Sequence, residues 1–232
     1  MSGYYPGPNP PDAAELRVLG SLIEKRRTTP DAYPLSVNSL RLACNQVTNR
    51  DPVVDFDEHT ILDALEHLGR RGWTRLASGA GSRARKYRHM FDEALGLADP
   101  EVALLCVLML RGPQTPGELK QRTDRLHSFA DLTAIEETLD RLIDRELAAR
   151  LPRRPGQKEQ RYVQLLDGGE PDEDGSTQRA PAALATESST LPPESSPSTV
   201  DPPDEGDRTG RLEREVAELR ERVARLEDLL GA

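Results

Sequence analysis

The sequence predicts a mainly α-helical α+β protein with two tandem winged-helix domains and a C-terminal coiled-coil helix. Two observations predict it: an internal repeat in which three helices precede a β-hairpin, and a heptad pattern near the C-terminus. From them we expect a flexible N-terminus at 1–11, a first winged-helix domain at 12–94, a second at 95–166, a disordered acidic Pro- and Ser-rich linker at 167–209 and a coiled-coil helix at 210–231.

The repeat is clearest in the third helix of each copy. In "TILDALEHLGRRGW" the apolar positions from Ile61 to Trp73 are spaced by 4, 3 and 5 residues. In "AIEETLDRLIDREL" the spacing is the same, and each position from Ile135 to Leu147 lies 74 residues after its counterpart. This spacing is typical of an amphipathic helix that runs into a strand.

Each copy also has an apolar first helix, a Thr-Pro pair and a basic hairpin. The first helices are predicted in "AELRVLGSLIEKR" and "EVALLCVLMLRG", and the pairs Thr29-Pro30 and Thr115-Pro116 follow them. "TPGE" predicts Thr115 as an N-cap and Glu118 as its reciprocal cap. The hairpins, "TRLASGAGSRARKYRHM" and "AARLPRRPGQKEQRYVQLL", each contain Gly and a late Tyr. The first copy is longer, and we place much of its excess between its second and third helices.

The acidity of the chain belongs to its C-terminal part. Residues 1–166 contain 24 Lys plus Arg and 23 Asp plus Glu, whereas residues 167–232 contain 7 and 17. The linker has too few large apolar side chains to offset the chain entropy lost on folding, so we expect it to be disordered.

The sequence also indicates where in the cell the protein is found. The longest apolar run, at 102–110, has nine residues, against the roughly 20 needed to cross a membrane. The N-terminus lacks the basic and apolar regions of a signal peptide. Cys44 and Cys106 lack metal-ligand spacing and fit small core residues in a reducing compartment. We therefore expect a cytoplasmic protein that does not contact membranes.

Four stretches resemble the YceH-like family of bacterial proteins. They are "TTPDAYPLSVNSLRLACNQVTNRDPV", "GSRARKY", "LRGPQTPGELKQRTDRLHSF" and "PGQKEQRY", in order over about residues 14 to 166. The resemblance implies a tandem winged-helix fold, in agreement with the repeat. It implies no established activity, substrate or catalytic residue. The proline-rich linker is a departure, since we expect a shorter connection to the terminal helix in a typical relative.

The predicted terminal helix, "RLEREVAELRERVARLEDLL", has a coiled-coil seam with alternating steps of 4 and 3. The seam residues are Leu212, Val216, Leu219, Val223, Leu226 and Leu230. Val at a and Leu at d favour a parallel pair, in which Glu215 would face Arg220 and Arg222 would face Glu227 of the partner. We expect a homodimer through this helix; the alternative is an amphipathic helix that docks on its own domain.

Both predicted third helices are too acidic for conventional reading of a major groove. A groove-reading helix approaches phosphates and should therefore present basic or amide side chains. The first instead presents Asp57, Glu58, Asp63 and Glu66, and the second presents Asp131, Glu136, Glu137, Asp140 and Asp144. Asp63, Glu66, Glu136 and Asp140 are thus candidate contacts to a basic protein partner.

The hairpins are basic, and they carry most of the candidate nucleic-acid contacts. These are Arg83, Arg85, Lys86 and Arg88 in the first hairpin and Arg153, Arg154 and Lys158 in the second. One interpretation is a wing that contacts the phosphate backbone of double-stranded DNA. The other is a solvated hairpin whose charges keep its edge strands from aggregating.

The stretch "PLSVNSLRLACNQVTNRDP" adds four candidate contacts. We expect Ser36 to cap a second helix that packs through Leu40, Leu42 and Cys44. Asn45, Gln46, Asn49 and Arg50 would then face outward. Amides and arginines suit base edges and also the backbone of a protein partner. A loop that caps its own helices remains open as well.

No enzymatic chemistry is indicated. The sequence has no nucleophile elbow, P-loop or dinucleotide fingerprint, and no cofactor is expected. His59, Asp63 and His67 follow an i, i+4, i+8 pattern, which we interpret as a polar surface stripe rather than a metal site. We expect a non-enzymatic, DNA-associated regulatory protein that acts as a transcriptional regulator and contacts DNA mainly through the basic hairpins. The alternative is a protein-interaction scaffold that uses the acidic third helices.

Overall fold

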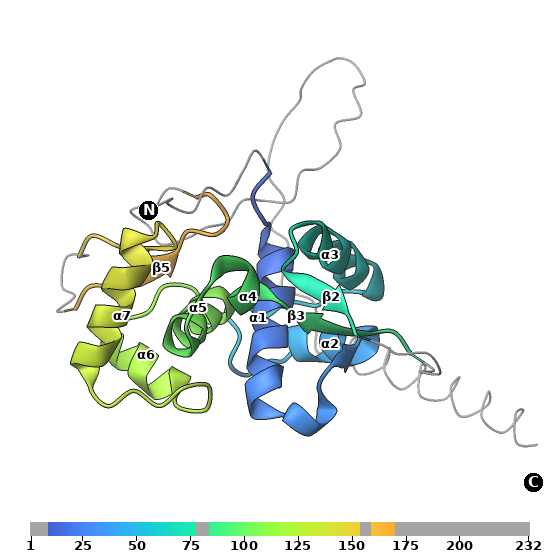
Figure 1. Ribbon diagram of the computed structural model, residues 1–232, viewed down its shortest axis with the longest axis horizontal. Helices are drawn as coiled ribbons and strands as arrows, with labels where there is room; N and C mark the ends of the chain where they lie inside the picture. The colour runs from blue at the N-terminus through green and yellow to red at the C-terminus, as the bar shows by residue number, and fades with distance from the viewer. Residues whose placement is uncertain (1–8, 78–83, 154–158, 170–232) are drawn as a thin grey trace, which may run out of the picture. The chain divides into compact units, whose positions relative to one another are not determined.

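The computed structural model describes residues 9–77, 84–153 and 159–169 (Figure 1). Within these residues the chain forms a mixed fold of helices with small antiparallel sheets, as expected for α+β. The elements are α1 (Ala13–Thr28), a 3-10 turn η1 (Pro30–Ala32), β1 (Leu35–Ser36), α2 (Val37–Cys44), α3 (Glu58–Arg70), β2 (Thr74–Leu76), β3 (Lys86–His89), α4 (Phe91–Leu95), α5 (Asp99–Arg111), α6 (Pro116–Thr123), α7 (Leu132–Asp144), β4 (Ala148–Arg150) and β5 (Tyr162–Gln164).

Local sequence sets the ends of these helices. The side chains of Asp12, Ser36, Asp57 and Asp131 accept hydrogen bonds from the backbone three residues on and so cap α1, α2, α3 and α7. The expected capping box is confirmed at α6. The Thr115 hydroxyl oxygen accepts a hydrogen bond from Glu118 N–H, and the Glu118 carboxylate accepts one from Thr115 N–H.

In both repeats the second hairpin strand also pairs with the chain one or two residues before the second helix. β3 lies between β1 and β2, with Tyr87 opposite both Leu35 and Leu76. In the second repeat β4 pairs with β5, and Gln114 forms an isolated antiparallel bridge with Tyr162. Neither β1 nor this bridge is predicted from the sequence, because a strand of one or two residues is too short to show an alternation of apolar and polar side chains.

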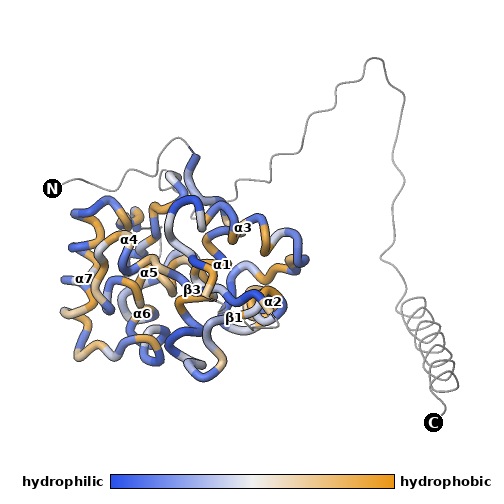
Figure 2. The backbone as a smooth tube through the Cα atoms, turned by 45° about the vertical axis from the view of Figure 1, so that its right-hand side comes forward, coloured by the Kyte–Doolittle hydropathy of each residue, from blue (hydrophilic) through white to orange (hydrophobic). Residues whose placement is uncertain are grey.

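The two repeats share one hydrophobic core. α1 and α5 are buried on nearly all sides and pack against each other (Figure 1), and hydrophobic chain segments meet around α5 (Figure 2). A Cβ added at Gly20 of α1 would lie 2.9 Å from Cγ of Leu110 in α5. Glycine therefore lets the two first helices cross closely.

Three expectations about the first repeat need correction. Ser36, rather than Thr29, occupies the position that Thr115 has in the second repeat, because Ser36 caps the second helix. The extra length of the first repeat therefore lies on both sides of α2. Leu42 points outward and is 59% exposed, although we expected it to pack inward.

Other expectations concern parts of the chain outside the described residues. They are the flexible N-terminus over residues 1–8, the linker beyond residue 169 and the coiled-coil seam at 212–230. Within the described ranges, no helix combines the length and hydropathy needed to span a membrane.

Candidate functional site

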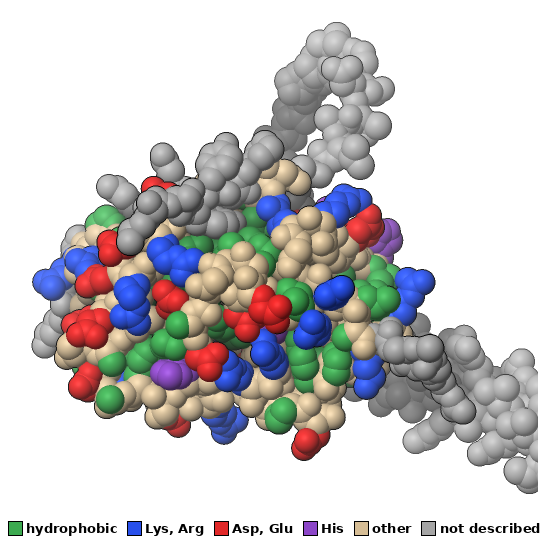
Figure 3. Space-filling view, viewed as in Figure 1, with side chains coloured by type: hydrophobic (Ala, Val, Ile, Leu, Met, Phe, Trp, Pro, Cys, Tyr) green, Lys and Arg blue, Asp and Glu red, His purple; other side chains and the backbone are tan. Residues whose placement is uncertain are grey.

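The sheet of the first repeat brings cationic side chains together on one face. Arg75 of β2 lies directly opposite Arg88 of β3. Since side chains alternate along a strand, Lys86 shares this face with Arg88, and its partner on β1 is Ser36. We call Arg75, Lys86 and Arg88, together with Arg85, the wing cluster; Arg85 directly precedes β3 and, by the same alternation, does not share the face of Lys86 and Arg88. Lys and Arg side chains are visible over this β2–β3 region in Figure 3.

The wing cluster is not neutralised by the fold. Like charges directly opposite each other destabilise a sheet. None of its four members forms an ion pair with a carboxylate in the part of the chain that the structure describes, and Arg75, Arg85 and Lys86 are exposed. Many other arginines are held by acids, namely Arg26, Arg27, Arg50, Arg70, Arg71, Arg122, Arg145 and Arg150.

Sequence reasoning missed Arg75. Only the pairing register of β2 and β3 places Arg75 opposite Arg88, and this register cannot be read from the sequence. Arg83, the remaining candidate in this hairpin, lies outside the described residues.

The second hairpin presents less free charge. Arg150 pairs with Asp140 at 3.1 Å and lies over the Tyr162 ring, and Arg161 donates to the Pro113 carbonyl. Arg153 is exposed, whereas Arg154 and Lys158 are outside the described residues.

The predicted contact stretch at 45–50 folds back on the protein. The expectation that Arg50 faces outward is wrong, because its side chain is fully buried and bonds Glu24 and the Ala43 carbonyl. Asn45 donates to the Phe56 carbonyl and accepts from Phe56 N–H, both at 2.9 Å. Both residues therefore fix a loop, which matches the alternative of a stretch that caps its own structure.

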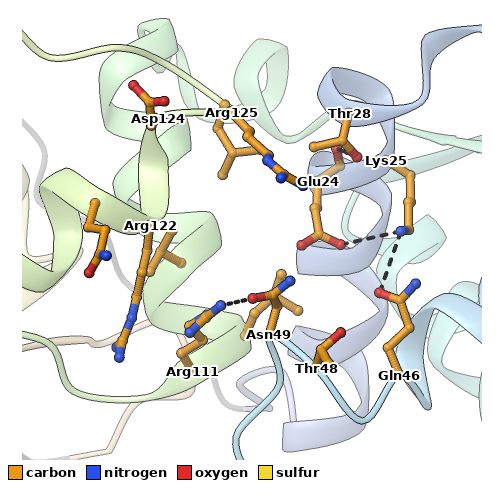
Figure 4. A pocket seen from close by; sticks show the side chains of 14 residues that line it. Glu24, Lys25, Thr28, Gln46, Thr48, Asn49, Arg111, Arg122, Asp124 and Arg125 are labelled. Atoms are coloured by element: carbon orange, nitrogen blue, oxygen red, sulfur yellow. Dashed lines mark hydrogen bonds and ion pairs between the residues drawn. The ribbon is translucent and has the colours of Figure 1, made fainter.

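Gln46 and Asn49 instead line a cavity between the repeats. Asn49 is exposed with a φ of 62°, and its Oδ1 accepts from Arg111 of α5. Gln46 accepts from Lys25 at 3.4 Å (Figure 4). The cavity has a volume of about 660 Å³.

The acidic surfaces of α3 and α7 are confirmed. Asp63, Glu66, Glu136 and Asp140 are exposed, as are Asp57, Glu58, Asp131, Glu137 and Asp144. Asp63 pairs with His59 at 2.7 Å, Glu66 with Arg70, and Asp140 with Arg150. Across the described ranges, no group of three or more His, Cys, Asp or Glu could hold a metal ion.

Comparison with known proteins identifies the family. The sequence profile described as "Protein of unknown function, DUF480" matches residues 12–157. The chain belongs to this family. It is 47% identical over 209 residues to a UPF0502 protein of Solibacter usitatus, covering 90% of this chain and 92% of the relative. A UPF0502 protein of Shewanella sp. (strain MR-7) is 42% identical over 224 residues, covering 94% and 95%.

The DUF480 match begins at Asp12, the N-cap of α1, and ends at residue 157, between β4 and β5 in the sequence. It therefore includes the wing cluster, the cavity and both acidic helices. The predicted coiled-coil seam lies beyond it, although alignments to the two relatives cover at least 90% of the chain.

Proposed function

We propose that this protein is a non-enzymatic, DNA-associated regulatory protein with two tandem winged-helix domains, acting in transcription in the cytoplasm. The element order supports the fold type: three helices precede a hairpin in both repeats, which also agrees with the YceH-like resemblance. In this proposal the first hairpin provides the main contact to double-stranded DNA.

The observation that carries the proposal is the pairing of Arg75 with Arg88. Two guanidinium groups on opposite strands repel each other, and Lys86 adds a third cation to the same face. A DNA phosphate placed between them would replace this repulsion with attraction and release counterions. The wing cluster therefore has chemistry that favours a polyanion.

Contacts of this kind position a protein on DNA without reading its sequence. The exposed acids on α3 and α7 disfavour insertion of either third helix into the major groove. We therefore expect duplex binding that depends strongly on salt and little on sequence, with Arg153 of the second hairpin as a secondary contact.

The test is fluorescence anisotropy with a random-sequence duplex at two salt concentrations, about 50 and 200 mM. Arg75→Gln plus Lys86→Gln removes two exposed cations from the sheet. Arg70→Gln plus Arg141→Gln is the matched control, because it removes two exposed cations from α3 and α7. We expect only the first variant to bind more weakly and to lower the salt slope by about 2. No binding by the unmodified chain at low salt, or equal loss in both variants, would overturn the proposal.

A second candidate function is a protein-interaction scaffold. The observation that favours it is Glu136, which is exposed on α7 and has no ion-pair partner among the described residues. Leu132 on the same helix and Leu62 on α3 are 46% and 40% exposed, so acidic and apolar groups lie together on both helices. This surface suits a basic partner. If the protein is such a scaffold, the variant Glu136→Lys plus Asp140→Lys should lose binding of the protein partner. The unmodified chain should then show no binding to duplex DNA.

A further inference from the structure

The cavity between the repeats has the size of a small-molecule site. Its volume of about 660 Å³ lies within the roughly 300 to 1,000 Å³ of typical ligand pockets. Its walls are the last turns of α1, α5 and α6, residues 124–126 after α6, and Gln46, Thr48 and Asn49. Because α1 and α5 pack in one shared core, both repeats hold the cavity open.

Cations outnumber carboxylates on the walls. The described lining contains Lys25, Arg111, Arg122 and Arg125, against Glu24 and Asp124. Lys25 lies 3.8 Å from Glu24 and Arg122 lies 3.5 Å from Glu118, so Arg111 and Arg125 are the two that pair with no acid in the described ranges. Glu24 is already paired with the buried Arg50 at 2.6 Å, so much of its charge is compensated. Figure 4 shows that the cationic side chains come from both repeats, with Arg111 directed at Asn49 and Lys25 at Gln46 and Glu24.

Arg111 shows that these cations interact unfavourably. Burial, and next the nearby Arg122 guanidinium, lower the pKa of Arg111. Within the described ranges its side chain donates to the neutral Oδ1 of Asn49 and pairs with no carboxylate, so it meets no opposite charge there. Arg125 is exposed and has neither a hydrogen bond nor an ion pair within the described ranges. Both guanidinium groups can therefore bind an added anion.

Several helix C-termini lie at this cavity, and the carbonyl groups of their last turns carry partial negative charge. Hydrogen bonds from capping groups already satisfy several of these carbonyls. Thr29 N–H donates to the Lys25 carbonyl, Gly112 N–H to the Leu108 carbonyl and the Gln114 side chain to the Arg111 carbonyl, all at 3.0 Å. A bound anion would therefore meet guanidinium groups in preference to bare carbonyls.

We propose that this cavity binds a small phosphate monoester of the sugar-phosphate class. A phosphate monoester places about two negative charges and three acceptor oxygens on one group, which suits Arg111 and Arg125 better than a single carboxylate does. Arg122, which already pairs with Glu118 at 3.5 Å, adds a further positive charge nearby. The neutral lining groups of Thr28, Gln46, Thr48 and Gln121 match the hydroxyls of a sugar. Since no aromatic side chain lines the described walls, they offer no stacking surface for a nucleobase.

The test uses the full chain with glucose 6-phosphate and inorganic phosphate as probes, at constant ionic strength set by sodium chloride. ³¹P NMR titration and thermal unfolding are followed up to about 10 mM probe, which reveals dissociation constants near 1 mM. We expect a saturable resonance shift and a midpoint of unfolding that rises with either probe. Chloride should produce no such rise.

Two variants localise the site. Arg111→Gln plus Arg125→Gln should weaken binding by about tenfold or more. Arg125→Gln alone keeps the Arg111–Asn49 contact, so it tests the site without risk to folding. The matched control is Arg75→Gln plus Lys86→Gln on the wing cluster, which should retain phosphate binding and bind duplex more weakly.

Three outcomes would overturn the proposal. One is the lack of saturable binding by both probes, and another is an equal loss in the control variant, which would indicate a general effect of surface charge. The third is displacement of glucose 6-phosphate by duplex DNA, which would make the cavity part of a DNA surface. Failure of duplex binding alone would leave the cavity proposal intact.

Discussion

Arg50 and Glu24 form an ion pair through both terminal guanidinium nitrogens, with Nη2–Oε2 at 2.6 Å and Nη1–Oε1 at 3.1 Å. The Arg50 side chain is fully buried and also donates to the Ala43 and Asn49 carbonyls. One arginine therefore holds the 45–50 stretch against α1. Removing one partner of such a pair leaves a buried charge without compensation.

We accordingly expect Arg50→Met to lower the free energy of unfolding by about 3 to 5 kcal/mol, measured by urea denaturation. The control is Arg41→Met, because Arg41 makes a single long contact, 3.4 Å to Asn38. The double variant with Glu24→Met should be less destabilised than the sum of the single variants, since neither charge then remains. Additive losses would contradict an energetic coupling between the two residues.

A second prediction concerns the crossing of α1 and α5. Gly20→Ala should destabilise the chain by about 1 to 3 kcal/mol, because the new Cβ would overlap Leu110. Gly117→Ala is the matched control: it is also helical and has no atom within 4 Å of the added Cβ, so it should stabilise by up to about 1 kcal/mol. Thermal unfolding of both variants gives the comparison. Stabilisation by both substitutions would show that the helices are not in close contact.

Much of the architecture is predictable because it depends on local patterns. The apolar spacing from Ile61 to Leu68 and from Ile135 to Leu142 marks the buried faces of α3 and α7, and Thr115 marks the start of α6. The shared core is not predictable, since the contact of Gly20 with Leu110 joins residues 90 positions apart. Periodicity describes one helix face and does not say which partner covers it.

The candidate site was predictable in part, for the same reason. Residue type and proximity in the sequence point to Lys86 and Arg88, but Arg75 joins them only through strand register. Arg50 has the composition of a contact residue, yet its partner Glu24 is 26 residues away on α1. Composition therefore identifies charged groups, and tertiary contacts decide which of them remain free.

A third prediction concerns pH. Burial lowers the pKa of His89 to about 4, while the neighbouring Asp92 carboxylate acts in the opposite direction. Nε2 lies 3.3 Å from Arg26 Nη1, where a neutral ring can accept from the guanidinium group. Nδ1 lies 3.4 Å from Asp92 Oδ1 without a hydrogen bond between the two atoms. The unfolded chain, with a pKa of about 6.5, takes up a proton before the folded chain does.

This contribution to stability is therefore fully present above pH 6.5 and is lost as the pH falls from about 6.5 towards 4. We expect the free energy of unfolding of the unmodified chain to fall by about 1 to 3 kcal/mol more over this range than that of His89→Gln. Urea denaturation at several pH values measures both. Parallel curves would contradict a buried neutral histidine.

The last prediction tests the proposed homodimer. Leu212, Val216, Leu219, Val223, Leu226 and Leu230 form the predicted seam. A chain ending at Gly169 keeps the described fold and removes this seam, so its mass per particle in light scattering should fall from two chains to one. Three heptads pair weakly, because short helices are marginal in water. The full chain should therefore dissociate on dilution. Val216→Asp plus Val223→Asp is the matched variant: it keeps the full length, places four carboxylates in the paired seam and should also yield monomers. A mass that neither change lowers would exclude this seam as the dimer contact.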